Sequence, residues 1–394
     1  MGHKDAMLLS PRRFAFVALM VLAVACRATP ERQAALGAPE TIAPGVDLYR
    51  TTDTLLVNGA GPIAVSLLKL DPARVHLNSA LSNGEVMSVE TVEGIAGRHG
   101  AVAAVNGGFF NVANGEPTGL LKVAGELVSD TAAPRGAVVI GRQSATATAL
   151  TFDQLAAKVS MTFTAGEQTW NVPVDGVDTT RARGKLMLYT PTYHTDTDTA
   201  PTGTEWVLNG APLRVVDVRM NFGHTRIPQK GAVLSFGGTD LPENLAALVE
   251  DVQVSFQTVW KSVHGLSEAD LNAAAHIVGG AGLLRRDGNV LTDWGTEGLK
   301  QDTFTDMRHP RTLIGVDRNG SIWIAAIDGR QPDYSIGMTF ADLQRLCDRL
   351  DLASALNLDG GGSTTMVVKG QLVNKPSDPA GPRPVSDAIV VTLR

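Results

Sequence analysis

Short runs in which apolar and polar residues alternate make up most of the chain after Val46, for example "GPIAVSLLKL", "ARVHLNSALS" and "AVAAVNGGFF". A period of two residues is typical of β-strands with one buried face. Glycine-containing turns separate several of these runs, and hairpins are predicted around Ala124-Gly125 and Asp287-Gly288. The pattern therefore predicts a sheet-rich fold with many short strands.

A helical period is present in only a few segments. The clearest, "TFADLQRLCDRLDLA", has Thr339 as a helix cap and Asp342 at the position that completes a capping box. Cys347 lies on the apolar face of this segment and is predicted to be a small core residue. An earlier helix is expected to begin after Ser88 as its N-cap. The predicted helices cover about residues 88–100, 267–276 and 340–352. We therefore classify the chain as a mixed α+β fold, a sheet-rich domain with a few helices packed on the sheet.

The first 26 residues predict export. Basic residues precede the apolar run Phe14–Ala25, which is too short to span a bilayer comfortably and resembles the core of a signal peptide. Cys26 follows Ala25 directly, as in a bacterial lipobox, although Leu22 lies one place earlier than the usual leucine. We favour a lipid-anchored protein of the bacterial cell envelope, with Cys26 as the lipidated residue. The alternative is plain cleavage after Ala25, which would give a secreted or periplasmic protein.

Composition and charge narrow the classes of function. Residues 27–45 are polar, contain prolines and predict a flexible tether, so that residues 46–394 would form the folded domain. The net charge is -6 and no long basic run occurs, so nucleic acid is not expected as a partner. A membrane contact is expected only through the N-terminal lipid. The chain has two cysteines, which excludes a disulfide framework.

The stretch "NLDGGGSTTMVV" holds the strongest candidate for chemistry. Asp359 follows an apolar strand and precedes three consecutive glycines. Glycines let a ligand approach the backbone, and consecutive main-chain N–H groups can form an anion-binding nest. The stretch is neither a P-loop nor a nucleophile elbow. We favour a ligand site over the alternative, a tight turn capped by an aspartate. The candidate ligand-binding residues are Gly361, Gly362, Ser363 and Thr364.

A second carboxylate follows another apolar strand. Asp328 comes directly after "SIWIAAI" and precedes Gly329. Together with Asp359 it would supply a general acid and a nucleophile or base. The alternative is an ordinary Asp-Gly turn.

Polar and aromatic residues also end the strand "AVAAVNGGFF". The amide of Asn106 is a candidate for binding a sugar hydroxyl, with Gly108 beside it. Phe109 or Phe110 would stack on the apolar face of a sugar. The alternative is a plain Asn-Gly hairpin.

Cationic candidates occur in two other motifs. His309 and Arg311 lie just before a strand in "RHPRTLIGVD", and Arg383 stands between two prolines in "GPRPVSDAIVV". The guanidinium fork suits phosphate. A surface charge without a ligand is the alternative for each arginine.

No cofactor or metal is expected. The histidines are scattered, and no cysteine–histidine cluster has zinc spacing. The stretch "TDTDT" lacks the glycine and the distal glutamate of an EF-hand loop. A structural calcium ion bound by aspartates is the alternative.

The order of the motifs resembles the phosphodiester glycosidase family. The matching motifs are "AVNGGFF", "PTGLLKVAGELVSD", "IPQKGAVLSFGG", "HIVGGAGLLRRDG", "RHPRTLIGVD", "AAIDGR", "LNLDGGGSTTMVV" and the closing "NKPSDPAGPRPVSDAIVV". The resemblance covers residues 101–394 and more loosely begins at residue 46. It implies a hydrolase that cleaves the glycosidic bond of a sugar-1-phosphodiester, such as a GlcNAc-1-phosphodiester, with a glycan or sugar-phosphodiester as partner.

This reaction suggests roles for the candidate residues. Asp359 and Asp328 would support an oxocarbenium-like transition state, one of them as nucleophile or base. Arg311 and Arg383 would hold the phosphodiester, and Asn106 would orient the sugar. The main-chain N–H groups of Gly361, Gly362 and Ser363 would add donors.

Two other functions are kept as alternatives. One is a phosphodiesterase that breaks the P–O bond, and the other is a non-catalytic lipoprotein that binds carbohydrate or cell wall. In the motif "DGVDTTRARG", Asp178 stands where the family leads us to expect an asparagine, which leaves the role of Arg181 open.

Overall fold

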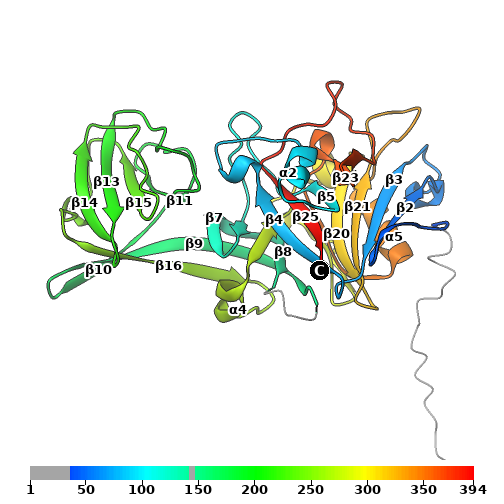
Figure 1. Cartoon of the computed structure of the whole chain (residues 1–394), viewed down its shortest axis with the longest axis horizontal. Helices are drawn as coiled ribbons and strands as arrows, with labels where there is room; N and C mark the ends of the chain where they lie inside the picture. Colours follow the sequence, from blue (N-terminus) through cyan, green and yellow to red (C-terminus); the bar gives the residue numbers. More distant parts are fainter. Residues whose placement is uncertain (1–35, 142–146) are drawn as a thin grey trace, which may run out of the picture.

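The structure, a computed structural model, describes residues 36–141 and 147–394 of the 394-residue chain. Figure 1 shows a body that contains both ends of the described chain and an outlying lobe built from its middle. The long antiparallel strands β9 (Leu150–Ala165) and β16 (Gln253–Ser262) join the two parts. The predicted signal peptide with Cys26, and the tether as far as residue 35, lie outside the described residues.

Two sheets lie in the body and pair segments that are far apart in the sequence. Their central strands are buried on both faces, which explains continuous apolar runs such as "SIWIAAI". In order, the first sheet contains β1 (Glu40–Ala43), β2 (Val46–Thr51), β3 (Val65–Leu70), β21 (Ile322–Ile327), β20 (Arg311–Asp317), β22 (Leu352–Asn357), β18 (Leu283–Arg286) and β19 (Asn289–Val290). The second contains β24 (Gln371–Leu372), β23 (Met366–Val368), β5 (Ala103–Asn106), β25 (Asp387–Leu393) and β4 (Val75–Leu81).

The third sheet runs from the lobe into the body. In order, it contains β11 (Gly176–Val177), β12 (Leu186–Tyr189), β15 (Ala232–Gly237), β13 (Gly203–Asn209), β14 (Arg214–Met220), β16, β9, β8 (Thr131–Ile140), β17 (His276–Gly279), β6 (Leu121–Val123) and β7 (Glu126–Ser129). Strand β10 (Gln168–Pro173) pairs with β9 beside this path.

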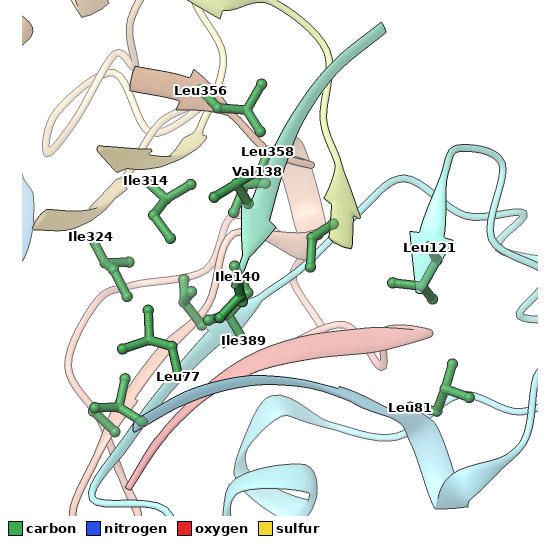
Figure 2. Packing of buried hydrophobic residues seen from close by; sticks show 14 of the residues in the cluster. Leu77, Leu81, Leu121, Val138, Ile140, Ile314, Ile324, Leu356, Leu358 and Ile389 are labelled. Atoms are coloured by element: carbon green, nitrogen blue, oxygen red, sulfur yellow. The ribbon is translucent and has the colours of Figure 1, made fainter. Parts of the chain in front are cut away.

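The three sheets share one central core, which is shown in Figure 2. Leu77 of β4, Ile140 of β8, Ile324 of β21 and Ile389 of β25 belong to the same fully buried cluster. The lobe has a separate cluster that includes Trp206. The central cluster also includes Met187 and Tyr189 of β12 and Val233 of β15, so burial of apolar surface joins the near side of the lobe to the body.

The longest helix, α5 (Phe340–Leu350), packs in a cluster with residues of β18, β20 and β21. Its predicted capping box is present, because Thr339 and Asp342 each accept a hydrogen bond from the other's main-chain N–H. Cys347 is buried on its inner face, as predicted. The other α-helices are α2 (Val92–Arg98), α3 (Glu243–Ala246) and α4 (Glu268–Ala273). Among the described residues, no helix is long and apolar enough to cross a membrane.

Both predicted hairpins are confirmed. The turns between β6 and β7 and between β18 and β19 each have two consecutive residues with positive φ. These are Ala124 and Gly125 in the first turn, and Asp287 and Gly288 in the second. Two positive φ angles match the twist of the flanking strands.

Two predicted boundaries are wrong. Residues 40–43 of the predicted tether form β1, whose strand pairing with β2 brings Ile42 into the core. The helix predicted to start after Ser88 begins at Val92 and is capped by Thr91. The hydroxyl of Ser88 instead accepts a hydrogen bond from the side chain of Asn83 at 2.9 Å.

Asp342 is expected to contribute more to stability than a cap alone. Its carboxylate is fully buried and forms ion pairs with Arg308 and Arg345. We expect Asp342→Ala to lower the free energy of unfolding by about 2–4 kcal/mol, because two guanidinium groups lose their partner. Thr339→Ala removes only the cap and should cost about 1 kcal/mol. Urea unfolding of both variants checks this, and equal losses would contradict it.

Candidate active site

A pocket of about 340 Å³ lies where the start of β20 and the end of β22 meet the triple-glycine turn. It brings together predicted residues from four distant segments of the chain. The predicted residues that line it are Phe109, His309, Arg311, Asp359, Gly361, Gly362 and Arg383. Phe304, Pro310, Arg330, Leu358 and Gly360 complete the lining.

Asp359 is the carboxylate of this pocket. Its side chain accepts a hydrogen bond from the N–H of Gly360 at 2.8 Å. Burial raises the pKa of Asp359 to about 6, and the nearby charge of Asp387 adds to this effect. The N–H of Gly360 and the charge of Arg383 act in the opposite direction. A carboxyl with this pKa changes its protonation state near neutral pH, which suits acid–base chemistry.

The three glycines are required by neighbouring protein groups. A Cβ on Gly360 would lie 2.6 Å from the carbonyl oxygen of Pro310, and one on Gly362 would lie 2.3 Å from Arg383. Gly361 has a φ of +62°, which favours glycine. The turn therefore needs three residues without side chains to pack against the pocket wall.

The predicted nest of main-chain donors is not formed as expected. The N–H of Gly361 donates to the carbonyl oxygen of Pro310 at 2.9 Å, and that of Ser363 donates to Gly360 at 3.1 Å. These two donors are already used within the protein. Ser363 and Thr364 are buried and do not line the pocket.

Arg311 is a part of the pocket wall. It is 2% exposed, and its guanidinium donates to the carbonyl oxygens of Phe304, Met307 and Met338. It also lies 4.9 Å from the ring centres of Phe304 and Phe340. Burial, together with the charge of Arg330, lowers the pKa of Arg311 to about 10. Arg311 therefore fixes the segment that carries Phe304.

Arg383 is positioned by an ion pair. Its Nε donates to Asp378 at 2.9 Å, and one terminal nitrogen lies 2.7 Å from the same carboxylate. The pair lies against Gly362. Asp378 therefore offsets part of the positive charge that Arg383 brings to the pocket.

Arg330 is the exposed cation of the pocket and is not among the site residues predicted from the sequence. In the described parts of the chain it forms no ion pair, and its guanidinium lies 3.4 Å from Nδ1 of His309. Its φ is +59°, which is uncommon for a residue with a side chain and often marks a functional position. Partial burial, with Arg311 nearby, lowers the pKa of His309. His309 therefore adds little positive charge at neutral pH.

Asn106 does not line the pocket. It is 1% exposed, and its Nδ2 donates to the carbonyl oxygen of Asp359 at 2.8 Å. Its Oδ1 accepts hydrogen bonds from the hydroxyl of Thr312 and the N–H of Thr365. The predicted role of Asn106 in orienting a sugar is therefore not supported, because its amide binds other parts of the protein.

Asp387 is a buried carboxylate that is not among the site residues predicted from the sequence. It accepts a hydrogen bond from the N–H of Gly108 at 3.1 Å, and burial raises its pKa to about 6. This contact, rather than a ligand, uses the main chain of Gly108. Gly107 lies directly above it, because a Cβ there would be 1.9 Å from Asp387. In the sequence, the position of Asp387 immediately before the apolar run "AIVV" was the signal that could have identified it.

The structure does not bring Asp328 into the pocket. Its carboxylate accepts hydrogen bonds from Tyr334, from the side chain of Asn374 and from the N–H of Lys375. Burial raises the pKa of Asp328, and these contacts act against the rise. Asp328 therefore holds two loops together, which argues against the predicted catalytic role.

One group among the described residues could hold a metal ion. Its ligand atoms, from Asp196, Asp198 and His224, lie within 4.8 Å of one another. The two aspartates come from the "TDTDT" stretch. Nδ1 of His224 lies 3.4 Å from a carboxylate oxygen of Asp196 and 3.7 Å from one of Asp198. None of the three lines the candidate active site.

A comparison with known families matches the part of the chain that carries most of the pocket residues. Residues 202–392 match the model of the phosphodiester glycosidase family. The resemblance to this family is thereby confirmed. N-acetylglucosamine-1-phosphodiester alpha-N-acetylglucosaminidase from Bos taurus is 35% identical over 75 residues, which are 19% of this chain and 14% of that protein. The Homo sapiens enzyme of the same name is 36% identical over the same shares. The chain thus matches only about one seventh of the length of these relatives.

Two solved structures share the fold. A hypothetical protein from Synechocystis superposes with a TM-score of 0.74 and 22% identity, over 89% of this chain and 63% of that one. A putative exported protein from Burkholderia pseudomallei gives a TM-score of 0.70 and 24% identity, over 86% and 76% of the two chains. At these identities the likeness shows the fold alone.

Gly107 should not tolerate a side chain. In Gly107→Ala the new Cβ would overlap the buried carboxylate of Asp387, so we expect a loss of about 2–4 kcal/mol in the free energy of unfolding. Gly119→Ala is the matched control, because no atom lies within 4 Å of its added Cβ. Its effect should stay within about 0.5 kcal/mol. Chemical unfolding measures both, and a tolerated Gly107→Ala would contradict the close packing.

Asp387→Asn should change the pH dependence of stability. The folded-state pKa of Asp387 is raised, so its contribution to stability is largest below pH 3.8 and is lost as the pH rises through about 6. Relative to Asp387→Asn, the wild type should lose on the order of 2 kcal/mol between pH 4 and pH 7. Removal of the like charge should also lower the pKa of Asp359.

Unfolding curves at several pH values and carboxyl-carbon NMR titration of Asp359 test both effects. The variant keeps an oxygen that can accept from Gly108, so a folded protein is expected. A pKa of Asp359 that stays the same or rises would contradict the electrostatic coupling.

Proposed function

We propose that the chain hydrolyses the glycosidic bond of a sugar-1-phosphodiester, of the kind represented by GlcNAc-1-phosphodiesters. The observation that carries this proposal is the pocket in which the carboxylate of Asp359 lies beside the guanidinium groups of Arg330 and Arg383. The confirmed family resemblance supports the same class of reaction.

The charges of the pocket suit a phosphodiester. Three arginines line it, with Asp359 inside and Asp378 against Arg383. The surplus positive charge attracts a substrate that carries one negative charge. Arg330 is the principal binding group in this proposal, because it is exposed and is not held in an ion pair by the described residues. Arg383 contributes a second, partly compensated guanidinium.

Asp359 acts at the anomeric carbon. With a pKa of about 6 it is largely ionised at neutral pH, and its negative charge stabilises the positive charge that develops on the sugar. Breaking the C–O bond releases a phosphate monoester anion that Arg330 and Arg383 stabilise. The oxygen of a water molecule bonds to the anomeric carbon and gives the free sugar, and the proton that this water loses passes to solvent. A weakly basic leaving group of this kind depends less on a general acid than an alcohol does.

Aromatic residues form the apolar side of the pocket. The rings of Phe109 and Phe304 lie 6.2 Å apart between centres and both line the cavity. Phe109 offers a face for the apolar side of a sugar ring. Arg311 supports this wall through its contacts with the Phe304 segment.

Export and anchoring belong to the same proposal. The basic residues and apolar run before Cys26 support passage out of the cytoplasm, and Cys26 supports a lipid anchor in the bacterial cell envelope. The expected substrate is then a glycan or sugar-phosphodiester outside the cell.

Asp359→Asn should reduce kcat/KM for sugar-1-phosphodiesters by about 10²- to 10⁴-fold, because the carboxylate that faces the anomeric carbon is lost. The matched control is Asp328→Asn, which changes a buried carboxylate outside the pocket and should leave kcat within about threefold. Steady-state kinetics on a panel of α- and β-linked substrates measure both.

Hydrolysis in ¹⁸O-water identifies the bond that breaks. Label in the sugar product supports glycosidic cleavage. Label in the phosphate product would instead show P–O cleavage by a phosphodiesterase. Binding without turnover, unchanged in Asp359→Asn, would show a carbohydrate-binding protein.

A further inference from the structure

A second pocket lies in the outlying lobe and has a volume of about 620 Å³. It is lined by residues from the segment that follows β11, from the loop before β13 and from the end of β15. The lining residues with polar side chains are Thr180, Arg181, Arg183, Asp198, Thr199, Thr202 and Thr239. The family resemblance and the proposed reaction leave this pocket without a role.

Arg181 forms the buried floor of this pocket. Its side chain is 4% exposed, and it donates to Ser235 at 2.7 Å and lies 3.5 Å from the fully buried Glu205. Gly203 and Gly237 are needed here, because a Cβ on either would come within 3.3 Å of Arg181 and closer still to main-chain oxygens. The fold therefore builds a fixed polar floor at a position whose role the sequence left open.

The charges of this pocket balance, unlike those of the candidate active site. Arg181 is offset by Glu205, and the exposed lining adds one cation, Arg183, and one carboxylate, Asp198. An anion therefore gains little by entering. Threonine hydroxyls, guanidinium groups and a carboxylate together offer both donors and acceptors. Sugar hydroxyl groups need both, so the lining suits an uncharged glycan.

The two pockets are connected by one loop. Glu116 is buried, and its carboxylate accepts hydrogen bonds from Thr180 at 2.7 Å and from Thr179 at 3.2 Å. Its carbonyl oxygen accepts from the N–H of Asn111 at 2.8 Å. Asn111 is two residues, at most about 7 Å, from Phe109 in the candidate active site. One short loop thus contacts the walls of both pockets.

We propose that the lobe pocket binds a neutral segment of the glycan whose sugar-1-phosphodiester is cleaved in the body. This inference rests on the proposed function, which supplies the reaction in the candidate active site. Arg183, Asp198 and the hydroxyls of the exposed Thr202 and Thr239 bind the sugar hydroxyl groups. The loop through Glu116 connects the wall of the lobe pocket to the segment that carries Phe109. The lobe would then select long substrates over short ones.

Thr202→Trp tests the pocket directly, because Thr202 is an exposed lining residue that an indole ring would fill. Thr169→Trp is the matched control, since Thr169 is exposed on β10 in the same lobe and does not line the pocket. The probes are the neutral tetrasaccharides chitotetraose, maltotetraose, cellotetraose and mannotetraose, observed by saturation-transfer NMR and titration calorimetry with the full exported chain.

We expect at least one tetrasaccharide to bind, with binding about tenfold weaker in Thr202→Trp and Arg183→Ala and unchanged in Thr169→Trp. The inference is overturned if no probe binds, if Thr202→Trp binds like the wild type, or if a sulfated tetrasaccharide binds more tightly than every neutral one. These measurements need no turnover, so they succeed or fail independently of the proposed reaction.

Kinetics then test the link between the sites. For a sugar-1-phosphodiester within a long glycan, Thr202→Trp should raise KM about five- to tenfold without changing kcat. For a single-sugar phosphodiester both constants should match the wild type. An equal effect on short and long substrates would contradict the role of the lobe.

Discussion

The hydrogen bonds of one side-chain amide hold the candidate active site together. Asn106, at the end of β5, binds the carbonyl oxygen of Asp359, the hydroxyl of Thr312 in β20 and the N–H of Thr365 before β23. Two of the three sheets and the triple-glycine turn thus meet at one residue that is 1% exposed. An amide supplies donors and an acceptor in a fixed plane, which a charged or apolar side chain of similar size cannot do. The position of Asp359 depends on this contact.

Burial gives the surrounding groups their different roles. Asp328, Asp359 and Asp387 are three carboxyls with raised pKa values, but their hydrogen bonds lead to different places. Asp328 is bound by two loops, and Asp387 by the N–H of Gly108 and the hydroxyl of Ser386. Only Asp359 combines such an environment with access to the pocket. A raised pKa alone therefore does not identify a candidate reactive carboxylate. The carboxylate must also line a pocket, and its two oxygens must not both be occupied by protein donors.

The sequence predicted the elements with strong local signals. The capping box at Thr339 and the two hairpin turns are confirmed, because a few neighbouring residues determine each of them. It also predicted that Asp359, Arg311 and Arg383 would share a cleft, since the motifs of the family carried that information.

The functions of single residues inside the site could not be read in the same way. The three glycines looked like donors for a ligand, yet Gly360 and Gly362 leave room for Pro310 and for the Arg383–Asp378 pair. These partners are far away in the sequence, so no local pattern reveals them. Arg330 was missed for a related reason. Its importance rests on a positive φ and on the lack of an ionic partner within residues 36–141 and 147–394, and both are properties of the folded chain.

The lobe raises the question of what holds it in place beside the body. The strands β9 and β16 form one connection, and a two-stranded ribbon by itself can twist and bend. Glu116 makes a second connection, because its buried carboxylate binds Thr179, Thr180 and Tyr193 of the lobe while its main chain belongs to the loop that follows Phe109. The N–H groups of Val86 and Met87 also donate to the carbonyl oxygens of Thr192 and Tyr193, at 2.9 and 3.1 Å. The lobe is therefore held to the body at several points. The loop beside the candidate active site is therefore also one of the parts of the body that orient the lobe, because its Glu116 contacts the wall of the lobe pocket through Thr180.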